Sequence, residues 1–477
     1  MHLSALLDFD AVPLDTDDAV SVLLDVTAPE REEDTARPPA TLQVVLDRSG
    51  SMGGSRLDGA VRALLGLVDR LAPSDNFGVV SFNEQARVEI PAGPLTDRAE
   101  TRRRIRALRA GGGTDLSSGL LRGVQEARRA GGDRGATLLL ISDGHANQGV
   151  TAHDLLQQVA SDAYAHGVTT TTLGYGLGFD EALLGAVADG GAGSALFAED
   201  PDTAGGLIAQ EAEYLLAKTA QAVSLRVPVG PRLRAVGVVG EMPSHRLPDG
   251  SVVVEFGDFH SGESRRLLLR LEVPGLSSLG TVTVTAFEAT YVDPATLTTY
   301  TATLPVTVNV VPGEQAASRV PRPEVRTEES LQRAQTAKRE AGEALRRGDR
   351  DTAADILDRA RRDLGGPAGS GGPAGYGAPA PPEVAAQSAE LGLMAERART
   401  DDASRTSKTL YASQSGYSRK RGRGQAPADA SGRDGVIRGE QTDRGRPAPD
   451  PAPPAAGGRG PGATAGPPQD PEPPRHG

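Results

Sequence analysis

Residues 41–52 read TLQVVLDRSGSM, an apolar run that ends in alternating acidic and hydroxyl side chains. The run Leu42–Leu46 is uncharged and has the length of a buried strand, and apolar residues recur at helical spacing from Leu57 to Leu71. A strand followed at once by an amphipathic helix is the repeating unit of a doubly wound α/β fold. This stretch therefore predicts a mostly parallel sheet with helices on both faces.

The same strand and helix signals alternate as far as residue 217. Further strands are predicted at Phe77–Phe82, Ala136–Ile141, Val168–Leu173 and Ala195–Ala198, and helices at 99–108, 116–130, 154–165 and 181–188. Strands that are apolar along nearly their whole length are typical of a parallel sheet buried on both faces. We therefore predict one α/β domain over residues 39–218.

Acidic and hydroxyl side chains follow the predicted strands at three places. Asp47, Ser49 and Ser51 follow the first strand, Thr114 ends a glycine-rich loop, and Asp143 follows a later strand. Ligands of open α/β sheets bind outside the carboxyl ends of the strands, where the strand order reverses. Carboxylate and hydroxyl oxygens are the ligands that a hard divalent cation such as Mg²⁺ prefers. The sequence therefore predicts that these side chains form one metal site.

The predicted site carries only two carboxylates, Asp47 and Asp143. A dication held by two negative charges stays attractive to a further carboxylate, so another molecule can complete the site. Phosphate binding is a rival interpretation of the glycine-rich loops, but neither loop ends in Gly-Lys-Ser/Thr. Helix capping and turn formation are the plainer alternative, because Ser, Thr and Asp often serve there.

The segment from about Thr41 to Ala217 resembles a von Willebrand factor type A domain. Its Asp47-x-Ser49-x-Ser51 run, its Gly-Gly-Thr ending at Thr114 and its Asp143-Gly144 are similar to that family's metal-ion-dependent adhesion site. The resemblance implies that the serines and threonine contact the metal directly or through water, the aspartates often through water, and that an acid of a protein ligand takes the sixth position. The implied cation is Mg²⁺, with Mn²⁺ or Ca²⁺ as alternatives. Type A domains coupled to β-sandwiches occur in bacterial proteins and in animal inter-α-trypsin inhibitor heavy chains.

Short alternating apolar runs separated by Pro and Gly predict an antiparallel β-sandwich over residues 219–315. Residues 1–38 contain a further run of this kind at Ala19–Val26. We predict that these N-terminal strands pair with the β-sandwich, so that the α/β domain is an insertion within it. The alternative is a small extra hairpin on the α/β sheet.

The C-terminal third is more polar. Residues 324–365 predict a helical hairpin similar to a single tetratricopeptide unit. One unit cannot bury a core, so the hairpin must dock on something or pair with a copy of itself. Residues 366–403 predict a linker and a short helix, and residues 404–477 a disordered tail. Basic and hydroxyl residues interleave at 404–423, which suits either a regulatory segment or a solubilising one.

Composition narrows the function classes. The net charge of −12 argues against nucleic-acid binding, which needs a basic face. The absence of cysteine excludes disulfides, zinc thiolate sites and thiol nucleophiles. Without a long apolar run or a good signal peptide, we expect no membrane span and a cytoplasmic location, and the excess of Arg over Lys indicates a bacterial source.

We expect a bacterial adaptor without enzymatic activity that binds a protein partner through the metal. His145 is the nearest candidate acid or base, but a hydrolytic mechanism lacks an obvious proton acceptor beside it. A Mg²⁺-dependent hydrolase is therefore the less favoured alternative. A third hypothesis is a partner subunit of an ATPase in a remodelling or metal-insertion complex, and that ATPase would be a separate protein because this sequence has no ATP-binding motif.

Overall fold

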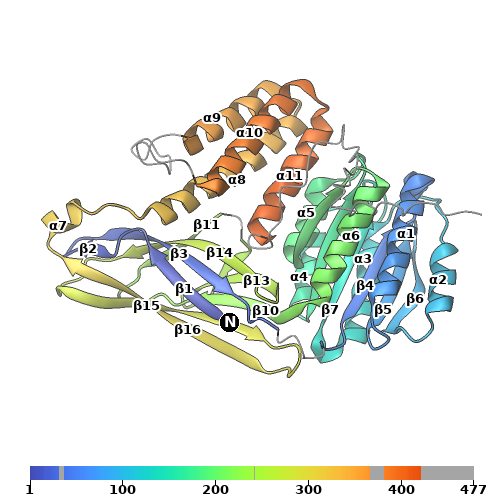
Figure 1. Cartoon of the computed structure of the whole chain (residues 1–477), viewed down its shortest axis with the longest axis horizontal. Coiled ribbons are helices and arrows are strands. Elements are labelled where there is room, and N and C mark those ends of the chain that lie inside the picture. The colour runs from blue at the N-terminus through green and yellow to red at the C-terminus, as the bar shows by residue number, and fades with distance from the viewer. Residues whose placement is uncertain (32–36, 241, 366–380, 421–477) are drawn as a thin grey trace, which may run out of the picture. The chain divides into compact units, whose positions relative to one another are not determined.

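The computed structural model of the protein describes residues 1–31, 37–240, 242–365 and 381–420. These residues form a mostly parallel sheet with helices on both faces, two mainly antiparallel sheets, and a group of C-terminal helices (Figure 1). The predicted fold class, a doubly wound α/β sheet with a β-sandwich and a helical segment, is confirmed. Within the described ranges, no helix is both long and apolar enough to cross a membrane.

The α/β sheet has the strand order β6-β5-β4-β7-β8-β9, and only β5 and β6 are antiparallel neighbours. Its strands are β4 (Thr41–Asp47), β5 (Asn76–Phe82), β6 (Ala86–Pro94), β7 (Ala136–Ser142), β8 (Val168–Tyr175) and β9 (Ala192–Ala198). Its helices are α1 (Ser55–Arg70), α2 (Arg98–Arg106), α3 (Leu116–Gly131), α4 (His153–Tyr164), α5 (Glu181–Gly190) and α6 (Pro201–Leu216), with short 3-10 turns at Gly50–Met52 and Gly132–Arg134. The order reverses between β4 and β7, and ligands of such sheets bind at this point.

Strand β4 lies at the centre of this sheet and contributes to two cores. Val44 and Leu46 pack in the cluster that contains residues of α1 and α6, whereas Val45 packs with residues of α3, α4 and α5. Successive side chains of a strand point to opposite faces, so a strand covered on both faces is apolar at most of its positions. This double burial explains why the run 42–46 is apolar at every position except Gln43.

The β-sandwich consists of a four-stranded sheet, β1-β3-β14-β11, and a six-stranded sheet, β12-β13-β10-β15-β16-β2. The strands are β1 (His2–Leu7), β2 (Ala11–Pro13), β3 (Asp18–Thr27), β10 (Lys218–Val227), β11 (Ala235–Val239), β12 (Ser244–Arg246), β13 (Val252–His260), β14 (Ser264–Val273), β15 (Gly280–Val292) and β16 (Thr299–Val311). Inward-facing residues of both sheets form one buried cluster.

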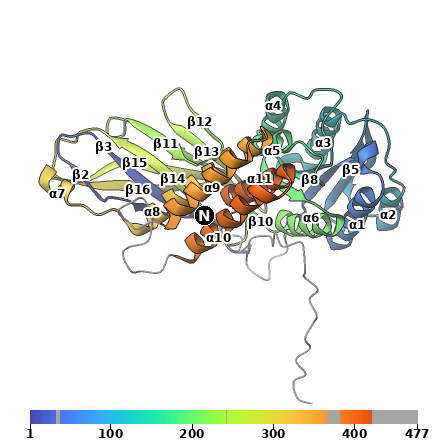
Figure 2. The same ribbon diagram turned by 90° about the horizontal axis from the view of Figure 1, so that it is seen from above.

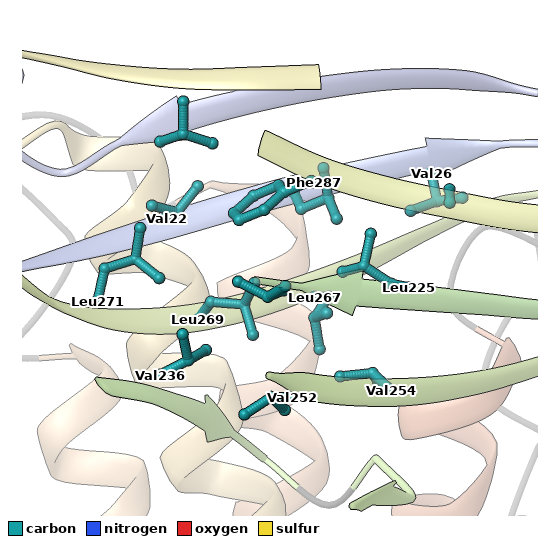
Figure 3. Close-up of a cluster of buried hydrophobic side chains, with 14 of the residues drawn as sticks. Val22, Val26, Leu225, Val236, Val252, Val254, Leu267, Leu269, Leu271 and Phe287 are labelled. Atoms are coloured by element: carbon teal, nitrogen blue, oxygen red, sulfur yellow. The ribbon is translucent and has the colours of Figure 1, made fainter. Parts of the chain in front are cut away.

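The N-terminal strands lie in these two sheets. Strand β3 pairs antiparallel with β14 along its whole length, from Asp18 opposite Val273 to Thr27 opposite Ser264, and β2 pairs parallel with β16. Val22 of β3 lies in the same core as Phe287 of β15 (Figure 3). The α/β domain therefore enters the chain between two sandwich strands, β3 and β10.

The C-terminal segment contains the short helix α7 (Gly313–Ala317) and the longer helices α8 (Pro323–Arg346), α9 (Arg350–Gly365), α10 (Pro382–Thr400) and α11 (Ala403–Lys420). The predicted hairpin corresponds to α8 and α9. Its apolar side chains share one cluster with those of the later helices, including Leu331, Leu357, Leu391 and Leu410. The hairpin thus buries its apolar face against α10 and α11.

The prediction of disorder from residue 404 is wrong for residues 404–420, which lie in α11. The helix has few apolar residues, which is why its composition indicated disorder. It is instead held by tertiary contacts: Leu410 is fully buried, and the polar side chains of Ser407, Lys408 and Gln414 are also buried. Of the remaining predictions for this region, the linker at 366–380 and the tail at 421–477 lie outside the described residues.

Replacing Leu24 with alanine should destabilise the β-sandwich by about 2–5 kcal/mol, because this fully buried side chain of β3 would leave a cavity against Leu267 of β14. Asp25→Ala is the matched control, since Asp25 makes a partly exposed ion pair with Arg266 and should cost less than about 1 kcal/mol. Denaturant unfolding with amide exchange checks this. Faster exchange confined to the α/β sheet would contradict the pairing.

Candidate metal site

The site residues lie at the carboxyl ends of β4 and β7 and on the loops beside them. Asp47 is the last residue of β4, and Asp143 directly follows β7. The two strands are parallel neighbours with Leu46 opposite Ile141, so Asp47 lies next to Ser142. The register thereby brings the two carboxylates, which are 96 positions apart in the sequence, to the same edge of the sheet.

Asp47 is fully buried, and both of its carboxylate oxygens accept hydrogen bonds. The backbone N–H of Ser49 donates to Oδ1 at 2.7 Å, and the hydroxyl of Ser142 donates to Oδ2 at 2.6 Å. Burial raises the pKa of Asp47, and the hydrogen bonds from Ser142 and Ser49 oppose that rise. The carboxylate is thus held in one orientation at a cost in desolvation.

The two serines connect Asp47 to Asp143. Ser51 Oγ donates to Asp143 Oδ1 at 2.7 Å, so Ser49 Oγ, at 3.0 Å, donates to Ser51 Oγ. Asp143 itself is buried. Together with the bond from the Ser49 backbone N–H to Asp47, these contacts connect four of the predicted ligands.

Thr114 reaches the same cluster from the third loop. A Cβ on Gly144 would lie 3.5 Å from Ser51 Oγ and 3.9 Å from Thr114 Oγ1, so both hydroxyls approach the same glycine. Asn147 fixes the threonine: its Oδ1 accepts from Thr114 N–H at 3.0 Å, and its own N–H donates to the Thr114 carbonyl at 3.1 Å. The structure therefore brings all the predicted ligands together.

The glycine-rich loop packs tightly against its neighbours. Gly112 has a φ of +84°, and a Cβ there would lie 2.8 Å from Nδ2 of Asn83. Its carbonyl accepts a hydrogen bond of 3.0 Å from the N–H of Gly50. Glycine at 112 thus satisfies both an unusual backbone conformation and a close approach between the first two loops.

Arg56 is a site residue that the sequence did not reveal. It lies in the first turn of α1, and its guanidinium donates to Asp143 Oδ2 and, at 3.2 Å, to the carbonyl of Ser51. The sequence does place an arginine shortly after the Asp-x-Ser-x-Ser run. The direction of its side chain, however, depends on where α1 begins. Arg56 offsets part of the negative charge of Asp143.

The structure also locates His145, the residue weighed as an acid or base. It is largely exposed, and its Nδ1 lies 3.8 Å from Oδ2 of Asp180. The same carboxylate oxygen lies 3.2 Å from Nε2 of His153. Asp180 is in turn the N-cap of α5. His145 is therefore directed toward a helix cap.

The donor set fits a hard divalent cation. It consists of two carboxylates and three hydroxyls, with oxygen as the only donor element, and such ligands suit a cation that keeps part of its water shell. The described residues contain no group of three or more His, Cys, Asp or Glu side chains placed to hold a metal ion. This arrangement therefore differs from an acidic cage, which would neutralise a cation fully.

An oxygen-lined site where the strand order of a doubly wound sheet reverses defines a class of ligand-binding α/β domains. Residues 42–210 match the family model of the von Willebrand factor type A domain. An uncharacterised protein of Synechocystis is 30% identical over 352 residues, which cover 70% of this chain and 81% of that protein. The chain belongs to the von Willebrand factor type A domain family.

Other relatives share shorter regions. YfbK of Escherichia coli is 26% identical over 53% of this chain and 45% of its own length, and mouse inter-alpha-trypsin inhibitor heavy chain H2 is 28% identical over 31% and 16%. This chain thus spans less than half of either protein.

Two solved structures share the fold over most of their length. The von Willebrand factor type A protein of Catenulispora acidiphila aligns with a TM-score of 0.64 and 19% identity, covering 83% of this chain and 89% of that one. The ArnB paralog VWA2 of Sulfolobus acidocaldarius aligns with a TM-score of 0.57 and 16% identity, covering 87% and 97%. The β-sandwich and helices thus accompany the type A domain elsewhere.

Asp47→Asn should raise the thermal unfolding midpoint of the metal-free protein at neutral pH. Because burial raises the pKa of Asp47, the fold loses stability as the pH rises from the ordinary aspartate pKa of about 3.9 through the raised value. The neutral amide removes this loss, so the gain should vanish as the pH falls below about 4. Calorimetry in EDTA across this range provides the measurement, and a lower midpoint than wild type at every pH would contradict it.

Proposed function

We propose that this protein binds a divalent cation, Mg²⁺ or alternatively Mn²⁺ or Ca²⁺, through Asp47, Ser49, Ser51, Thr114 and Asp143. The observation that carries the proposal is the convergence of these side chains from three loops into one oxygen-lined cluster at the strand-order reversal. Ser142 and Asn147 would orient Asp47 and Thr114 by hydrogen bonds without binding the cation, as residues outside the ligand shell of metal sites generally do.

The cation would in turn bind a protein partner. Type A domains are commonly metal-dependent protein-interaction modules, and the charge balance here suits that role. Two carboxylates face a dication, and Arg56 already offsets part of the charge of Asp143. The bound cation would therefore keep net attraction for a carboxylate from outside, which an acidic side chain of the partner supplies.

Binding rather than catalysis is the activity that we propose. Hydrolysis would require a base within reach of a nucleophile beside the cation, whereas His145 is directed at Asp180. We further propose that the protein binds its partner in the bacterial cytoplasm. The absence of cysteine is consistent with this reducing compartment.

Asp143→Ala should lose nearly all Mg²⁺ binding, and Thr114→Ala should lose less. The first change removes one of two negative charges and leaves the Arg56 guanidinium unpaired next to the cation, whereas the second removes a neutral hydroxyl. Ser55→Ala is the matched control, because this exposed hydroxyl begins α1 outside the cluster. Calorimetric titration with Mg²⁺ and Mn²⁺ decides the matter. Equal affinity in all four proteins would refute the proposed site.

Partner capture should depend on the cation and on Thr114. In a pull-down from native lysate, partners retained by the wild type in Mg²⁺ should be released by EDTA and should fail to bind Thr114→Ala even when that variant is saturated with Mg²⁺. The reason is that Thr114, itself buried, directly follows the more exposed residues 111–113, and we propose that this loop faces the partner. Retention that EDTA leaves unchanged would show that the partner binds elsewhere.

A further inference from the structure

Helix α11 contacts the α/β domain beside α5, far from it in sequence (Figure 1, Figure 2). Lys408 is the central residue of this contact and is almost fully buried. Its Nζ donates to Oε2 of Glu181 at 2.6 Å and to the carbonyl of Phe179 at 2.7 Å, and lies 4.4 Å from the centroid of the Phe179 ring. One lysine thus contacts both the first turn of α5 and the loop before it.

The partners of Lys408 are themselves well fixed. Glu181 is buried, and its Oε1 accepts a hydrogen bond of 3.0 Å from Ser407, the neighbour of Lys408 on α11. Arg346 of α8 approaches the same oxygen at 3.8 Å. Although burial opposes ionisation, Lys408 and the other donors lower the pKa of Glu181, so the Glu181 carboxylate is ionised at neutral pH. Removal of either charge would leave the other buried without its main partner.

The loop 176–180 links this contact to the candidate metal site. A Cβ on Gly178 would lie 2.9 Å from the carbonyl oxygen of Asp143, so the backbone of the loop presses directly against that residue. Gly176, with a φ of +75°, lies against the guanidinium of Arg56, which in turn holds the Asp143 carboxylate. Phe179, whose carbonyl Lys408 binds, is the next residue after Gly178.

We propose that Lys408 is a positioning residue for the metal site: through the carbonyl of Phe179 it holds the loop 176–180 against Asp143, so that cation affinity depends on the docking of α11. The statement about the loop rests on the contacts above, and the statement about affinity rests also on the proposed function. The described polar contacts of Lys408 are to Glu181 and Phe179 and include no cation ligand, so it acts through the loop.

The anchoring of α11 on its other side makes docking sensitive to single polar groups. Ser413 of α11 accepts a hydrogen bond of 2.9 Å from the buried Lys338 of α8 and donates to Glu390 of α10. Lys338 also donates to Glu390 at 2.9 Å. Buried polar contacts of this kind are strong when complete and costly when one member is lost. The state of the C-terminal helices is thereby transmitted to the loop beside Asp143.

The test compares Lys408→Met with Arg405→Met in the full-length protein. Methionine keeps the length of the Lys408 stem but removes its hydrogen bonds. Arg405 is the matched control, because it joins α11 to the same domain through a partly exposed ion pair of 2.5 Å with Glu199, a residue outside the loop 176–180. The double variant Lys408→Met/Glu181→Gln removes the unpaired buried carboxylate and so keeps the test available if Lys408→Met folds poorly.

Amide hydrogen exchange without metal and Mg²⁺ titration are the two measurements. Lys408→Met and the double variant should exchange faster at residues 176–180 and should bind Mg²⁺ about tenfold more weakly, the lower end of the effect of outer residues on metal affinity. Arg405→Met should match the wild type in both.

Unchanged exchange at 176–180 in both Lys408 variants, or an equal increase in Arg405→Met, would overturn the proposal. Faster exchange with unaltered Mg²⁺ affinity would overturn its coupling to the cation. If the wild type itself binds no Mg²⁺, the proposed function fails, while the exchange comparison still decides whether Lys408 positions the loop.

Discussion

A carboxylate removed from water at the end of β4 is the constraint on which the site depends. Burying the charge of Asp47 is costly unless its oxygens are paired, and the structure pairs them with the Ser49 amide and the Ser142 hydroxyl. The second of these partners requires β7 to lie parallel to β4 in the observed register. The order of the strands, the turn after β4 and the position of Asp143 are therefore coupled to one side chain.

The central strand and the ligand set could be predicted from sequence for the same reason. Val44 and Val45 pack in opposite cores, so β4 is mostly apolar, and the ligands lie at the end of a strand or in the loops just after one. Arg56, Asn147 and the loop 176–180 were missed, because their roles depend on the directions of side chains and loops that meet only in three dimensions. The local sequence therefore identifies the metal ligands, but it does not identify the residues that hold those ligands in position.

Helix α11 shows the opposite limit. Its composition resembles that of a disordered tail, and its helical state depends on Glu181, Lys338 and Glu390, which lie on three other helices. Periodicity detects a helix that buries an apolar stripe. It does not detect one whose buried face is largely lysine, serine and glutamine, because each of those residues is normally exposed. Whether such a segment is helical is determined by the residues that it packs against rather than by its own sequence.

The insertion of the α/β domain has a mechanical consequence. The chain enters the domain from β3, a central strand of the four-stranded sheet, and leaves it into β10, a central strand of the six-stranded sheet. A pulling force applied by a ligand at the metal edge is thus divided between two covalent connections that lead into different sheets. Each connecting strand has a hydrogen-bonded neighbour on both sides, so neither can be peeled away as an edge strand could. A domain held by two such connections should keep its orientation under tension, whereas a domain at the end of a single linker would be free to rotate.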